Sequence, residues 1–243
     1  MVVHEYELNL SKTEYLYYLQ CPRKFHIHRI LNPLSDKMAF LNSKRTTSSY
    51  FLRNYDEKKI RGIIDHSFFE TFHRRYYDKI TDPEPPEEIA SNQIKLLFWK
   101  YQQKKYLANP DYWIPYKTEL RLMTEKQRGI IDSLELCSDG KGLRIIDYKS
   151  KPHKNDKLSL IFYANLFNAF RIENKEIDLL SFRIKEIGCY YYEISEEIIY
   201  NMKQIELIQF QDSLNKILLN ISKEKFPSDS KCIRCKYFDI CII

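Results

Sequence analysis

The sequence predicts an α/β fold in which a central β-hairpin lies between helices. Two apolar, β-branched-rich runs flank Asp139-Gly140 within residues 129–149, which is the pattern of a hairpin. Residues 58–80, 89–107 and 158–170 instead carry apolar side chains at helical spacing. With 243 residues, the chain is long enough to bury a sizeable core, and we expect a single domain.

Composition excludes few classes of protein. The formal charge of +6 favours a nucleic-acid partner only mildly. No apolar run reaches the roughly 18 residues of a membrane span, and the first residues lack the basic and apolar regions of a signal peptide. We therefore expect a cytoplasmic protein with no membrane association.

The N-terminal half is predicted to be mainly helical. Ser11 is a plausible N-cap for a helix that delivers Cys21, and Pro22 should disturb that helix. The prolines of 81–88 predict a turn between the helices 58–80 and 89–107. The lysines and aromatic residues of 89–107 fit contacts with single-stranded DNA or simple amphipathic packing, and packing is favoured.

Strands surround the hairpin in the second half. Residues 116–123 predict the strand before it, and residues 182–194 predict further strands. Ser195 is expected to cap a long helix that reaches about Ile221.

The hairpin carries two acids and a lysine. A two-residue loop at Asp139-Gly140, with both residues at positive φ, sets a register that places Asp132 opposite Asp147. Cross-strand Cβ atoms lie roughly 4.5 to 5.5 Å apart, so two carboxylates there need a cation or a raised pKa. Lys149 follows Asp147 by two residues and projects from the same face. Apolar neighbours on both faces of the strands predict that these groups are buried.

The six cysteines fall into two classes. Cys137 and Cys189 lie in apolar, strand-like runs and are expected in the core. The other four form a 1+3 ligand set, with one cysteine near the N-terminus and three near the C-terminus: Cys21, Cys232, Cys235 and Cys241. Their spacing fits either zinc or an iron-sulfur cluster. Either metal would close a loop of about 210 residues, worth roughly 5 kcal/mol.

Gly129-x-x-Asp132 followed by Asp147-Tyr148-Lys149 resembles the RecB-like branch of the PD-(D/E)xK nucleases. The resemblance implies a mixed β-sheet flanked by helices. It also implies that Asp132 and Asp147 bind Mg²⁺ or Mn²⁺ and that Lys149 serves the attacking water.

Further positions match the same family in the same order. Gly62-x-x-x-His66 resembles a helix motif that supplies a metal ligand, although a lone histidine beside an apolar face is more often a core residue. Glu119 corresponds to a possible third carboxylate of the metal site. Tyr163 matches the tyrosine of a Q-x-x-x-Y motif, but Ser159 stands where the family has glutamine.

The cysteine segments resemble those of the family's iron-sulfur members. Cys21-Pro22-Arg23-Lys24-Phe25 is similar to the first-cysteine motif, and Cys232-x-x-Cys235-Lys236-Tyr237 to the last. The resemblance implies a 4Fe-4S cluster held by the 1+3 set. The cluster would lie in a helical lobe formed by about residues 1–57 and 222–243, beside a nuclease core of about residues 58–194.

This small iron-sulfur type resembles the CRISPR-associated RecB-like exonucleases. The resemblance implies hydrolysis of single-stranded DNA ends, 5′ to 3′, during CRISPR spacer acquisition, with CRISPR adaptation proteins as partners. A viral or repair-pathway nuclease and a catalytically weak DNA-binding scaffold are the alternatives. Because Ser159 replaces the family glutamine, a catalytically weak scaffold stays an alternative. The intact set of Asp132, Asp147 and Lys149 favours an enzyme.

Overall fold

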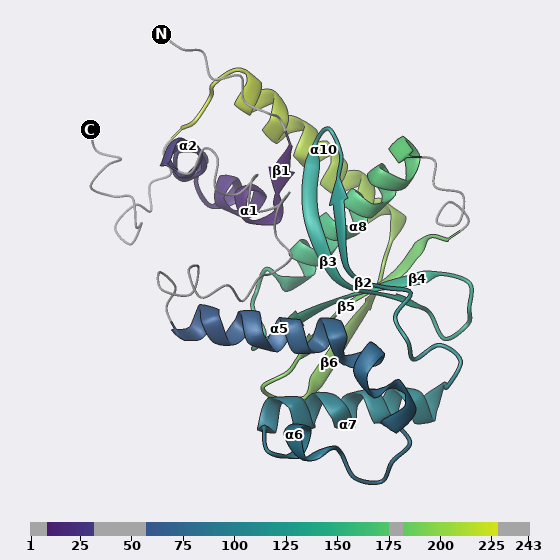
Figure 1. Ribbon diagram of the computed structural model, residues 1–243. Helices are drawn as coiled ribbons and strands as arrows, with labels where there is room; N and C mark the ends of the chain where they lie inside the picture. Colours follow the sequence, from purple (N-terminus) through teal and green to yellow (C-terminus); the bar gives the residue numbers. More distant parts are fainter. Residues whose placement is uncertain (1–8, 32–56, 175–181, 228–243) are drawn as a thin grey trace.

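The computed structural model describes residues 9–31, 57–174 and 182–227, which form a six-stranded sheet with helices on both faces (Figure 1). The strands are β1 (Leu10–Ser11), β2 (Lys117–Met123), β3 (Gln127–Leu136), β4 (Leu143–Lys149), β5 (Ile184–Tyr191) and β6 (Glu196–Asn201). The helices are α1 (Lys12–Gln20), α2 (Pro22–Leu31), α5 (Glu57–Tyr76), η1 (Tyr77–Lys79), α6 (Glu87–Ala90), α7 (Gln93–Ala108), α8 (Asp156–Asn174) and α10 (Gln204–Ser222). None of these helices is long and apolar enough to cross a membrane.

The sheet is mixed, as the family resemblance predicts. Its strand order is β1-β3-β4-β5-β6, and β2 also pairs with β3. β1 runs parallel to β3, and β4 runs parallel to β5, whereas the other pairs are antiparallel. β6 belongs to this sheet although it lies beyond residue 194, and the division into a core and a separate lobe stays a prediction.

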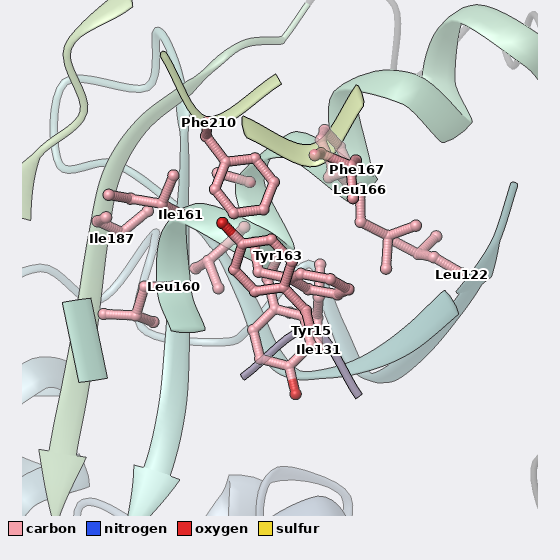
Figure 2. Packing of buried hydrophobic residues seen from close by; sticks show 14 of the residues in the cluster. Tyr15, Leu122, Ile131, Leu160, Ile161, Tyr163, Leu166, Phe167, Ile187 and Phe210 are labelled. Atoms are coloured by element: carbon pink, nitrogen blue, oxygen red, sulfur yellow. The ribbon is translucent and has the colours of Figure 1, made fainter. Parts of the chain in front are cut away.

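Two apolar cores cover the two faces of the sheet. One core joins the sheet to α8 and α10 and includes Ile145. Phe167 and Phe210 of the same core are labelled in Figure 2. The other joins it to α5 and α7 and includes Ile146 and Phe98. Because successive residues of β4 enter opposite cores, the prediction that the hairpin is buried on both faces is confirmed.

The register of the hairpin was predicted correctly, but the loop was not. Ser133 pairs with Ile146 and Leu136 with Leu143, as the predicted register requires. The loop spans four residues, since Cys137 N–H donates to Gly142 O at 2.9 Å, and only Gly140 has positive φ. Two-residue and four-residue loops centred on the same point give the same pairing, so the error in the loop left the register intact.

Two other predictions from the sequence need correction. Ser195 does not cap a helix: it has φ 54° in the turn between β5 and β6, and α10 begins only at Gln204. The intervening residues Glu196–Asn201 pair with β5, because their branched and aromatic side chains suit a strand. The predicted helix 89–107 is divided into α6 and α7, because the Asn92 side chain caps a new helix by accepting from Lys95 N–H.

The N-terminal helix begins and ends as predicted. The Ser11 side chain accepts from Glu14 N–H and the Glu14 side chain accepts from Ser11 N–H, which completes a capping box. Cys21 terminates the helix in an extended conformation, and Pro22 begins α2. Cys21 therefore lies between two helices, at a position fixed by the local sequence.

Candidate active site

Three carboxylates lie side by side on adjacent strands. In the β2–β3 register, Glu119 falls opposite Asp132, between the pairs Thr118–Ser133 and Leu120–Ile131. In the β3–β4 register, Asp147 falls on the other side of Asp132, one step beyond the pair Ser133–Ile146. Asp132 and Asp147 are both buried. The predicted pair of acids is thus part of a row of three, with Asp132 in the centre.

His66 of α5 reaches this row from the helix layer. Its Nδ1 lies 3.6 Å from Asp132 Oδ2 and 4.0 Å from Glu119 Oε1. One ligand atom from each of His66, Glu119 and Asp132 lies within 4.8 Å of the others. Ligands about 2.1 Å from a common octahedral ion are separated by about 3 to 4 Å, so this donor set fits Mg²⁺ or Mn²⁺.

The backbone of Glu119 is in an unusual conformation. Its φ of 48° lies in the left-handed region, which a residue with a long side chain rarely adopts inside a strand. Such a conformation costs of order 1–3 kcal/mol and persists only where the surroundings enforce it. Here it coincides with the carboxylate that faces His66 and Asp132, which is typical of a functional site.

Asp132 and Asp147 have different partners. Asp132 Oδ2 accepts a hydrogen bond of 2.9 Å from Tyr148 N–H, which ties its carboxylate to the C-terminal end of β4. Asp147 Oδ2 lies 2.5 Å from Lys149 Nζ and 3.9 Å from Lys12 Nζ. Burial acts to raise the pKa of Asp147, but attraction to the two lysines outweighs burial and lowers the pKa. Asp147 is therefore a carboxylate at neutral pH.

Lys149 is held between two acids. Its Nζ contacts Asp147 and lies 3.8 Å from Asp156 Oδ1, at the start of α8. Burial opposes the charged form, but the charge of Asp147 raises the pKa of Lys149 above its usual value. Lys149 is therefore a cation at neutral pH, as expected from the sequence.

Tyr163 closes the site on the α8 side, and Gly129 makes room for it. A Cβ atom at Gly129 would approach Tyr163 Cε1 to 3.0 Å, so any larger residue would displace the ring. This contact explains why the first position of the Gly129-x-x-Asp132 motif is a glycine: there is no room for a side chain. Ser159, four residues before Tyr163, donates its hydroxyl to Asn155 O within the same helix, at 3.0 Å.

Lys12 is a cation of the site that the sequence reasoning missed. It is the first residue of α1, and its Nζ lies 5.0 Å from the centre of the Tyr163 ring as well as 3.9 Å from Asp147. Burial alone would lower the pKa of Lys12, but Asp147 and Tyr163 raise it. The only signal in the sequence was its place directly after the predicted N-cap.

The cysteine predictions are tested only in part. Cys137 and Cys189 are buried core residues, as expected. Cys21 is half-buried at the end of α1, whereas Cys232, Cys235 and Cys241 lie outside the residues that the structure describes. The 1+3 ligand set therefore stays a prediction.

The aromatic residues of α7 serve packing rather than exposed stacking. All three of its central aromatic side chains are buried: Phe98 and Tyr101 pack against tyrosines of the sheet, and Trp99 packs against α5. Lys100 and Lys104 are exposed and line a cavity of about 510 Å³ between α7 and the edge of the sheet at the hairpin. The amphipathic interpretation of this segment is confirmed for its aromatic residues.

Comparison with known proteins identifies the family. A family model of the PD-(D/E)XK nuclease superfamily matches residues 9–242, which is nearly the whole chain. No curated protein sequence matches the chain. Members of this superfamily are metal-dependent nucleases, in agreement with the donor set of His66, Glu119 and Asp132. The chain therefore belongs to the PD-(D/E)XK nuclease superfamily.

Proposed function

We propose that this protein hydrolyses DNA phosphodiester bonds at the row of carboxylates on β2, β3 and β4. One observation carries the proposal: Glu119, Asp132 and His66 converge with metal-ligand spacing directly beside the Lys149–Asp147 pair. Buried like charges at this spacing are unfavourable without a cation. Superfamily membership supports the reaction class, and the geometry supports the choice of these residues.

The residues of the site divide the work in this proposal. Asp132, Asp147, Glu119 and His66 would hold Mg²⁺ or Mn²⁺. When bound, such an ion makes a water more acidic and neutralises charge that develops on the phosphate. Lys149 stays charged, so it orients the attacking water or stabilises the transition state. Tyr163 fills the space between α8 and the site, and its buried phenol keeps a raised pKa and thus its proton.

The finer assignment rests on the cysteine motifs. We infer an exonuclease of single-stranded DNA ends, acting 5′ to 3′ in CRISPR spacer acquisition, with a 4Fe-4S cluster on Cys21 and the three C-terminal cysteines. The described C-terminal segment supports the cluster, because Phe226 stacks on His26 of α2 at 4.3 Å between ring centres. Phe226 lies six residues before Cys232 and His26 lies five residues after Cys21, so this contact joins the segments that carry the two cysteines.

The metal site can be tested by thermal unfolding. Mn²⁺ should raise the melting temperature of the wild type, because an ion that binds only the folded state stabilises it by about 2.7 kcal/mol at one hundred times its Kd. Asp132→Asn should lose this response and the cleavage of DNA. Its metal-free melting temperature should equal or exceed that of the wild type, because the change relieves carboxylate repulsion.

Asp212→Asn is the matched control, since Asp212 is exposed on α10. It should respond to Mn²⁺ as the wild type does. Unchanged cleavage by Asp132→Asn would contradict the assignment of the site.

The role of Lys149 can be separated from metal binding. Lys149→Ala should keep the response to Mn²⁺ but lower the single-turnover cleavage of end-labelled single-stranded DNA by about two to three orders of magnitude. DNA affinity should fall only slightly. The control is Lys151→Ala, because Lys151 is exposed and pairs with Glu193 outside the site. If the rate holds while binding collapses, Lys149 is a phosphate clamp and its catalytic role is wrong.

The cluster can be tested by colour and metal content. Protein purified without oxygen should be brown, and Cys232→Ala should lose both colour and solubility, because a cluster ligand is also a link between the chain ends. Cys137→Ala should keep the colour, since Cys137 is a core residue. A colourless wild type with stoichiometric zinc would refute the iron-sulfur assignment.

A further inference from the structure

The N-terminal segment places a second lysine in the candidate active site. Lys12 begins α1, more than a hundred residues before Asp132 in the sequence, yet its Nζ lies 3.9 Å from Asp147 Oδ2 and 5.0 Å from the centre of the Tyr163 ring. About a quarter of its side chain is exposed. A cation that reaches the reacting acids and keeps access to solvent can meet a substrate.

Rigid neighbours hold Lys12 in this position. Leu10, two residues earlier, is fully buried, and β1 pairs with the start of β3. Glu14, two residues later, is buried and contacts Arg29 at 2.7 Å and Arg128 at 2.9 Å. These two ion pairs of Glu14 fix the first turn of α1 against the sheet, because Arg128 belongs to β3. Lys12 is therefore pre-positioned rather than free to swing in from solvent.

The two lysines beside Asp147 differ in their other partners. Lys149 has a second carboxylate, Asp156, at 3.8 Å. Among the residues that the structure describes, Asp147 is the one acid within 4 Å of Lys12 Nζ. Once the oxygens of Asp147 serve a divalent ion, Lys149 retains a carboxylate partner, whereas Lys12 is left with the neutral phenol of Tyr163. An anionic oxygen of the substrate would then replace Asp147 as the negatively charged partner of Lys12.

We propose that Lys12 binds a phosphate oxygen of the DNA at the reacting phosphodiester, so that it is a second catalytic cation beside Lys149. The inference rests on the proposed nuclease function. It divides the work between the lysines: Lys149 acts chiefly on the rate of the chemical step, whereas Lys12 holds the phosphate and contributes to both binding and rate. An ammonium suits this task because it contacts phosphate as a point charge.

The first test measures binding without cleavage. The affinity of a short single-stranded oligodeoxynucleotide is measured at several salt concentrations with Ca²⁺, which also prefers oxygen ligands. Lys12→Gln should weaken binding about tenfold and reduce the slope of log affinity against log salt by about 0.7, the value for one lost phosphate contact on a single strand. Lys12→Arg should restore most of the slope. Lys126→Gln is the control, because Lys126 is exposed near the start of β3 and bonds to Asn215.

The second test measures single-turnover cleavage with Mn²⁺. Lys12→Gln should lower the rate about ten- to a hundredfold, with rescue by Lys12→Arg and an unchanged melting-temperature response to Mn²⁺. An unchanged salt slope would overturn the inference, even if Lys12→Gln lowered stability, because a purely structural partner of Asp147 makes no phosphate contact. If the wild type binds DNA but does not cleave it, the proposed function fails while the salt slope still decides the role of Lys12.

Discussion

The structure depends on how the sheet accommodates three carboxylates on neighbouring strands. Glu119, Asp132 and Asp147 occupy one row, and Asp132 and Asp147 are almost fully excluded from water. Repulsion between such groups is stronger in a buried setting than in solvent. Two lysines neutralise Asp147, and the remaining concentration of negative charge around Asp132 is what favours a divalent cation there. The charge that is unfavourable for folding is thus the charge that the chemistry requires.

The fold gathers the compensating groups from distant parts of the chain. Figure 1 shows α5 and α8 on opposite sides of the sheet. His66 comes from α5, Tyr163 comes from α8, and Lys12, directly after β1, lies beside them. Glu119 takes a left-handed backbone conformation to join them. The apolar cores on both faces hold these elements rigidly, which keeps the charged groups in place before any substrate arrives.

The sequence predicted the parts of this site that depend on local rules. Turn residues and strand alternation were enough to place Asp132 beside Asp147, and they remained enough although the loop has four residues. The parts that depend on long-range packing were not predictable. β1 has only two residues, so its pairing with β3 and the position of Lys12 leave no periodic signal. Ser195 looked like an N-cap because a serine before two glutamates favours a helix start, but pairing with β5 overrides that local preference.

The central claim is that Asp132 anchors a divalent metal between the strands of this sheet. Anomalous diffraction from crystals soaked in Mn²⁺ tests it most directly, because the signal locates the ion without assumptions about activity. We expect a peak about 2.0–2.2 Å from oxygens of Asp132 and of at least one other acid of the row, with His66 beside it. No peak at saturating Mn²⁺, or a peak only at sites remote from Asp132, would contradict it.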